Sequence, residues 1–186
     1  NIGLLARNRI AQLDAAGAAT GWNPNANNTV MALAKIGSMV YAGGVFTQIG
    51  GQSISYLAAI DPAGTVQNWN PFLNSSVRAL GTNGGTLYLG GDFTNLNSGA
   101  APRLYIGAMA GATALATPWD PVAQSLVKCL LVSGYTIYAG GSFAHVSRQP
   151  QSHLVAIEDP GPVGVGDAPS NGAGGLAPRN APNPFS

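Results

Sequence analysis

The chain has 186 residues, of which 8% are charged and 46% are hydrophobic, and its formal net charge is +1. Its eight Lys and Arg residues are scattered, which excludes a nucleic-acid binder that depends on a dense positive field. No apolar run approaches the length of a membrane-spanning helix, and the apolar content is too high for a wholly disordered chain.

One sequence pattern recurs along the chain, and three anchors define it. Trp22, Trp69 and Trp119 lie 47 and 50 residues apart, and each precedes Asn-Pro or Asp-Pro. A Tyr-x-Gly-Gly-x-Phe phrase recurs in the same register, starting at Tyr41, Tyr88 and Tyr138. A short apolar run completes the pattern at residues 10–13, 57–60, 106–109 and 154–157. Three anchors in one register indicate an internal repeat.

Each repeat is expected to contain four short strands. The first begins near Val30, Val77 or Leu126, the second carries the paired glycines, the third is the apolar run, and the fourth leads into tryptophan. Turn residues separate the strands, as in Asp61-Pro62-Ala63-Gly64, where the order of residues is typical of a type I turn.

Four strands in about 47–50 residues predict an all-β fold, a β-propeller segment of about three and a half four-stranded blades. The blades fall near residues 22–68, 69–118 and 119–159, with a partial blade at 1–21. Paired glycines are expected where backbones approach closely or φ is positive, and Tyr, Phe and Trp are expected to pack between sheets. Because closed propellers have about 4–8 blades, we expect further blades in the same chain; ring closure by association is the alternative.

The composition changes after residue 159. Residues 160–186 contain six Pro and six Gly but no Trp or Tyr, which predicts a flexible linker. The chain begins at Asn1 with no signal-peptide pattern, so we expect a fragment or a processed chain.

The recurring phrases resemble a known bacterial family over residues 1–158. They read Trp22-Asn23-Pro24-Asn25, Val30-Met31-Ala32-Leu33, Tyr41-Ala42-Gly43-Gly44-Val45-Phe46-Thr47, Ile49-Gly50-Gly51 and Ala58-Ala59-Ile60-Asp61. This pattern is similar to the delta-60 type β-propeller repeat, a family of unknown function. Its arginine before the third strand is matched by Arg7 and Arg103, whereas Ile54 and Gln151 replace it in the other copies, and the copy near Gly111 lacks the aspartate.

The last residues carry a second resemblance. Ala181-Pro182-Asn183-Pro184-Phe185-Ser186 is similar to the opening of a C-terminal sorting domain of a bacterial secretion pathway. The resemblance implies a secreted or cell-surface bacterial protein whose sorting domain follows the linker.

The carboxylates are the first candidate catalytic groups. Asp14 and Asp61 are repeat equivalents before turns, so we interpret them as turn residues that bond to their own backbone. Asp120 replaces an asparagine before proline and is interpreted in the same way. Asp92 follows a glycine pair, at a position where the other copies have Val45 and Ser142. Of the carboxylates, it is the one whose presence the repeat pattern explains least.

The remaining polar candidates also favour structural roles. His145 and His153, the only histidines, lack metal-ligand spacing and are expected at loops or strand edges. Cys129 is the only cysteine and lies in an apolar run, so we expect a small buried core residue rather than a nucleophile. Asn27 and Asn74 fit the glycosylation sequon, but as repeat equivalents they are better explained by turn preference.

A propeller site is usually built from loops that differ between blades. Those loops are 52–56, 97–103 and 147–153, and their charged or titratable groups are Arg103, Arg148 and His153. These groups do not identify a ligand, and we assign no catalytic, cofactor-binding or metal-binding residue. We expect a non-catalytic structural or binding module for a protein or carbohydrate partner, with no cofactor. The alternative is part of a propeller enzyme, of hydrolase or oxidase type, whose site other blades or domains complete.

Overall fold

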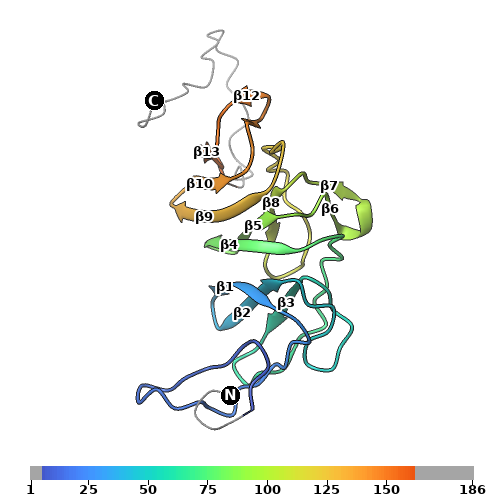
Figure 1. Cartoon of the computed structure of the whole chain (residues 1–186), viewed down its shortest axis with the longest axis vertical. Helices are drawn as coiled ribbons and strands as arrows, with labels where there is room; N and C mark the ends of the chain where they lie inside the picture. The colour runs from blue at the N-terminus through green and yellow to red at the C-terminus, as the bar shows by residue number, and fades with distance from the viewer. Residues whose placement is uncertain (1–5, 162–186) are drawn as a thin grey trace, which may run out of the picture.

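The computed structural model describes residues 6–161 and confirms the all-β prediction (Figure 1). It contains three antiparallel three-stranded sheets in which consecutive long strands are hydrogen-bonded neighbours. The first comprises β1 (Val30–Ile36), β2 (Met39–Gly44) and β3 (Leu57–Ile60). The second comprises β4 (Val77–Asn83), β5 (Thr86–Gly91) and β8 (Ile106–Ala110). The third comprises β9 (Val127–Ser133), β10 (Thr136–Gly141) and β13 (Leu154–Glu158).

A small hairpin interrupts the connection between the second and third strands of the second and third repeats. In the second repeat it is β6 (Asn95–Leu96) and β7 (Ala101–Pro102), joined through the 3-10 turn η1 (Asn97–Gly99). In the third repeat it is β11 (His145–Val146) and β12 (Gln149–Pro150). In the first repeat a single bridge between Ile49 and Gln52 replaces it.

The expected fourth strand is much reduced in the structure. After β3, the chain turns at Asp61 and returns to pair with that strand only through the bridge between Ile60 and Val66. The second repeat has the equivalent bridge between Met109 and Ala116. The segment then runs into Trp-Asn-Pro or Trp-Asp-Pro, and proline has no N–H to continue a ladder. The first two units are therefore three-stranded sheets with one added bridge each.

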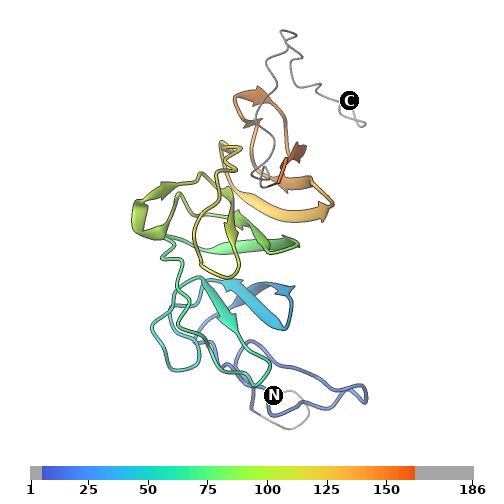
Figure 2. The same ribbon diagram turned by 180° about the vertical axis from the view of Figure 1, so that it is seen from behind.

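The three sheets stack in chain order along the long axis of the molecule (Figures 1 and 2). Strand β1 lies against β4, and β4 lies against β9. The first glycine of each pair makes this approach close: a Cβ on Gly43 would lie 2.7 Å from Cγ1 of Val77, and one on Gly90 would lie 2.6 Å from Cγ1 of Val127. Neither glycine has a positive φ, so close backbone approach is the reason for glycine here.

Aromatic side chains lie between neighbouring sheets, as the repeat predicts. The rings of Tyr41 and Trp69 meet edge to face with centroids 5.2 Å apart, and those of Tyr88 and Trp119 do so at 5.3 Å. The hydroxyl of Tyr41 donates to the carbonyl of Gly111 in the next repeat at 3.0 Å. Each aromatic pair therefore joins one sheet to the sheet that follows it.

The described residues form a stack of sheets and no closed ring. They also contain no helix that is long and apolar enough to cross a membrane. The expected linker and sorting-domain opening fall within 160–186, of which residues 162–186 lie outside the described part of the chain.

Candidate functional site

The repeated aspartates hold turns, as the sequence predicts. Oδ1 of Asp14 accepts hydrogen bonds from the backbone N–H groups two and four residues later, both at 2.9 Å. Oδ1 of Asp61 accepts the equivalent pair at 2.9 and 2.8 Å. Each carboxylate therefore satisfies backbone donors of its own turn.

Asp92 has a local partner that repetition alone did not reveal. One carboxylate oxygen accepts a hydrogen bond from Nε of Arg78 at 2.8 Å and another from the hydroxyl of Ser76. In the first repeat, Met31 stands at the position of Arg78 and Val45 at that of Asp92. The second repeat has thus replaced an apolar pair with an ion pair, and Asp92 belongs to that pair.

The arginine before the third strand acts as a cross-link to the returning segment. Nη2 of Arg103 donates to the carbonyl of Thr117 at 2.6 Å, and Arg7 donates to the equivalent carbonyl of Thr20. Arg103 also lies 3.5 Å from Oδ2 of Asp120, so this carboxylate is an ion-pair partner as well as a neighbour of proline. In the first repeat Ile54 holds the arginine position, and Gln52 Nε2 instead donates to the carbonyl of Val66 at 2.7 Å.

The histidines and the cysteine do not form a metal site. His145 is exposed on β11, where Nδ1 lies 3.0 Å from Oε1 of Gln124, and His153 is exposed before β13. Among residues 6–161, no three His, Cys, Asp or Glu side chains gather where they would hold a metal ion.

The prediction that Cys129 is a buried core residue is wrong, because its side chain is exposed. It lies on the face of the third sheet that no other sheet within residues 6–161 covers. Its equivalents are Ala32 and Ala79, and Ala79 is 7% exposed because the third sheet packs over it. Burial at this position therefore depends on the next sheet.

Asn27 and Asn74 have the same structural role in successive repeats. Oδ1 of Asn27 accepts hydrogen bonds from the N–H groups of Thr47 and Gln48, and its Nδ2 donates to the Thr47 hydroxyl at 3.0 Å. Asn74 makes the equivalent three bonds to Thr94 and Asn95. Both amides join the loop before the first strand to the loop after the second, which confirms their interpretation as loop residues.

The loops that differ between repeats remain separate. Arg103 comes from the loop 97–103, whereas Arg148 and His153 share the loop 147–153. No hydrogen bond or ion pair in residues 6–161 links any two of the three differing loops. The backbone strain in these loops also recurs: the residue before each third strand has φ between 64° and 69°, and this holds for Arg9, Tyr56, Tyr105 and His153. Because the strain recurs in every copy, it belongs to the fold rather than to one site.

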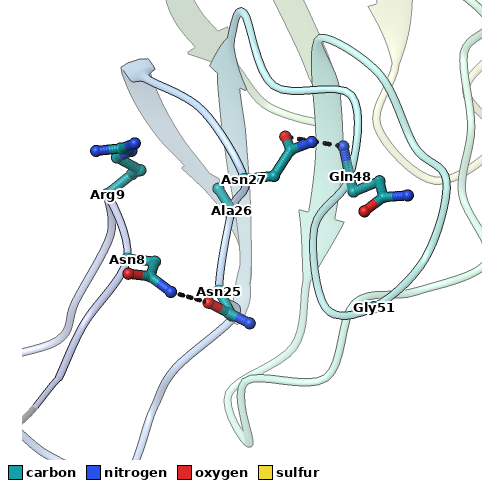
Figure 3. Close-up of a pocket in the computed structure, with 7 residues that line it drawn as sticks. All are labelled: Asn8, Arg9, Asn25, Ala26, Asn27, Gln48 and Gly51. Atoms are coloured by element: carbon teal, nitrogen blue, oxygen red, sulfur yellow. Dashed lines mark hydrogen bonds between the residues drawn. The ribbon is translucent and has the colours of Figure 1, made fainter.

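A polar cleft of about 320 Å³ opens at the loop end of the first repeat (Figure 3). It lies between the segment before residue 10, the loop that leads into β1, and the β2–β3 connection. Its lining residues are Asn8, Arg9, Asn25, Ala26, Asn27, Gln48 and Gly51. Ala26 is buried at its floor, and the other six residues are exposed.

Hydrogen bonds and left-handed backbone shape this cleft. Nδ2 of Asn8 donates to Oδ1 of Asn25 at 2.5 Å, and the three bonds of Asn27 hold the opposite loop. Asn25 and Gly51 have φ of 56° and 75°, a conformation that asparagine and glycine adopt more readily than other residues. Figure 3 shows Arg9 and Gln48 on opposite sides, with Asn25 and Asn27 between them.

The cleft combines four side-chain amides with one guanidinium group. An amide both donates and accepts hydrogen bonds, and a guanidinium group pairs with carboxylates through two parallel bonds. The described lining contains no Asp, Glu or His. The cleft therefore presents hydrogen-bonding groups and one positive charge, rather than a general acid and base.

Sequence reasoning missed this cleft, although the repeats contain a signal for it. Asn25 stands where the other copies have Phe72 and Val122, and Asn8 stands where the second repeat has Leu104. The position of Asn8 holds serine in the other two copies, Ser55 and Ser152, so Asn25 is the amide that departs most clearly from the repeat. The differing loops 52–56, 97–103 and 147–153 all precede a third strand, whereas the cleft also needs the loop that leads into β1.

No family model and no curated protein matches this chain. The crystal structure of the computationally designed Ika4 protein is similar to it at a TM-score of 0.40 and 16% identity, over 71% of this chain and 92% of that one. The crystal structure of the computationally designed Ika8 protein gives a TM-score of 0.39 and 17% identity, over 73% of this chain and 53% of that one. At these TM-scores neither likeness assigns a fold family or a function.

Proposed function

We propose that this chain is a non-catalytic binding module, a β-propeller segment of the delta-60 repeat type that holds a carbohydrate in the cleft of its first repeat. The observation that carries the proposal is the cleft itself, which gathers Asn8, Asn25 and Gln48 beside Arg9. The other copies have Phe72 and Val122 at the position of Asn25, so this amide is specific to the first repeat.

The chemistry of the cleft favours a sugar that carries a carboxylate. Sugar hydroxyls both donate and accept hydrogen bonds, and the amides of Asn25 and Gln48 match both roles. Arg9 supplies the positive charge that a uronic acid carboxylate requires. None of the described residues that line the cleft is aromatic, so we assign recognition to their hydrogen bonds and charge rather than to ring stacking.

The propeller part of the proposal is supported by the repeats themselves. Three sheets with one register stack through the same glycine–valine contact and the same tyrosine–tryptophan pair. Export from a bacterial cell is proposed from the sequence of the tail alone, since residues 162–186 lie outside the described structure.

Affinity electrophoresis through gels that contain polygalacturonate or dextran tests the binding proposal. We expect retardation in polygalacturonate, and we expect Arg9→Gln to remove most of it. Arg148→Gln is the matched control, because it removes the same charge from an exposed site in the third repeat and leaves the cleft intact. Migration that neither polysaccharide retards, or an equal loss in both variants, contradicts the proposal.

A further inference from the structure

Phe72 is an exposed aromatic residue in the loop that leads into β4. It is 58% exposed, although the second sheet has a neighbouring sheet on both sides. It stands at the position of Asn25, which lines the cleft, and of Val122 in the third repeat. The exposure of Phe72 is therefore a property of its place in the repeat, and an end of the stack does not cause it.

The backbone at Phe72 is also unfavourable for an aromatic residue. All three equivalents are left-handed, with φ of 56° at Asn25, 49° at Phe72 and 41° at Val122. Asparagine adopts this conformation readily, whereas bulky and β-branched residues rarely do. Phe72 thus combines an exposed apolar ring with a strained backbone, and an asparagine at the same position would avoid both costs. Strain that packing does not require points to a function.

Phe72 projects from the same end of the molecule as the cleft. In each copy the proline before this position and the residue after it are buried, so the outward residue leaves its repeat in the same direction. The β2–β3 connection joins the two places. Its residues Gln48 and Gly51 line the cleft, and Tyr56 at its other end packs against the cluster that contains Leu73. Equivalent positions in packed sheets lie about 10 Å apart, so a chain of several sugars can contact both places.

The surroundings of Phe72 fit a sugar better than a protein surface. Its neighbours Pro71 and Leu73 are buried, and the next residues along the loop are Asn70 and Asn74. The ring is therefore flanked by amides, whereas the core of a protein interface is a contiguous apolar patch.

From these observations we infer that an acidic polysaccharide held by Arg9 continues along this end of the molecule and stacks a sugar ring on Phe72, outside the cleft. The inference rests on the proposed function of the cleft. The C–H groups on one face of a sugar ring form an apolar surface that packs on an aromatic ring. This contact removes the ring of Phe72 from water and offsets the cost of its exposure.

Affinity electrophoresis of the full chain in polygalacturonate gels tests this contact. We expect Phe72→Ala to weaken binding roughly tenfold, which is a typical contribution of one aromatic contact. Phe72→Trp keeps an aromatic surface and is expected to keep the binding. Leu131→Ala is the matched control, because it removes an apolar side chain that is 64% exposed on β9 rather than in a loop.

A stability measurement separates binding from a structural role of the ring. Phe72→Asn introduces the residue of the first repeat, which adopts the left-handed backbone readily. We expect this variant to unfold at the same or a higher urea concentration than the native chain while it binds polygalacturonate less tightly. A loss of stability in Phe72→Asn would show that the ring packs within the protein, and it overturns the inference.

NMR titration of the full chain with an oligogalacturonate locates the ligand. We expect the amide signals of Phe72 and Leu73 to shift together with those of the cleft, and shifts confined to the cleft overturn the inference. The electrophoresis distinguishes this failure from that of the proposed function. If polygalacturonate does not retard the native chain, both are wrong. If Arg9→Gln removes the retardation and Phe72→Ala leaves it unchanged, only the contact with Phe72 is wrong.

Discussion

The hydrogen bond between Tyr88 and Asp159 joins the second sheet to the end of the third, and its removal has a calculable cost. The phenol donates to Oδ2 of Asp159 at 2.6 Å, and the two residues are 1% and 8% exposed. Tyr88→Phe keeps the ring against Trp119 but leaves one oxygen of a buried carboxylate without this donor. A hydrogen bond to a charged group contributes roughly 1.5–3 kcal/mol, so we expect the free energy of unfolding to fall by about that amount.

Urea denaturation followed by tryptophan fluorescence measures this loss. Tyr138→Phe is the matched control, because the same hydroxyl is removed from the equivalent position on β10 of the third sheet. Tyr138 is 40% exposed and makes no side-chain hydrogen bond within residues 6–161, so its loss costs less than about 0.5 kcal/mol. Equal effects of the two substitutions would refute the claim that inter-sheet bonds stabilise the stack.

The same hydrogen bond makes the stability of the folded protein depend on pH in the alkaline range. Burial, together with the hydrogen bond to Asp159 and its charge, raises the pKa of Tyr88 well above its ordinary value of 10.0. Above pH 10 the unfolded chain therefore loses the phenol proton that the folded chain keeps, and stability falls as pH rises. We expect the free energy of unfolding to decline more steeply above pH 10 in the native chain than in Tyr88→Phe. Parallel pH profiles for the two proteins would contradict this assignment.

Two further predictions concern the contacts between sheets. Gly90→Ala places a Cβ 2.6 Å from Cγ1 of Val127, a branched side chain that cannot turn away, so we expect a loss of about 1–3 kcal/mol in urea denaturation. In Gly140→Ala the new Cβ meets only the exposed sulfur of Cys129 at this distance, so we expect almost no change in the free energy of unfolding. If Gly90→Ala also left this free energy unchanged, close packing between the sheets would not require glycine. Trp22→Phe loses a hydrogen bond of 3.1 Å, whereas Trp69 Nε1 has no partner among the described residues. We therefore expect Trp22→Phe to lower the melting temperature more than Trp69→Phe. The reverse order would contradict this account.

One difference between the repeats explains why Trp69 lacks the hydrogen bond that Trp22 makes. The second repeat has Ala110 where the first has Asp61. Without the carboxylate, the turn is held by the carbonyl of Ala110, which accepts the N–H groups of Thr113 and Ala114. This carbonyl stands at the position that accepts Trp22 Nε1 in the first repeat. The loss of one aspartate thus changes the environment of a tryptophan from the preceding repeat.

The sequence by itself determined the repeat, the all-β class and the roles of the residues that recur. The roles of recurring residues could be predicted because their bonds are local. Asp61 bonds within its own turn, and Asn27 bonds to a loop of its own repeat. The extent of the fourth strand was overestimated, since apolar residues before Trp-Asn-Pro do not show where a proline stops the ladder.

Only the tertiary structure decided which copies are covered and where the cleft lies. Cys129 lies in an apolar run that is typical of a core strand, yet it is exposed. In this stack a residue on that face is buried only where another sheet packs over it, as β9 packs over β4. The cleft joins Asn8, Asn25 and Gln48 from three separate segments, and their approach depends on left-handed turns that the sequence does not specify at Arg9. Local pattern sets each sheet, whereas burial and site geometry are properties of contacts between segments distant in the chain.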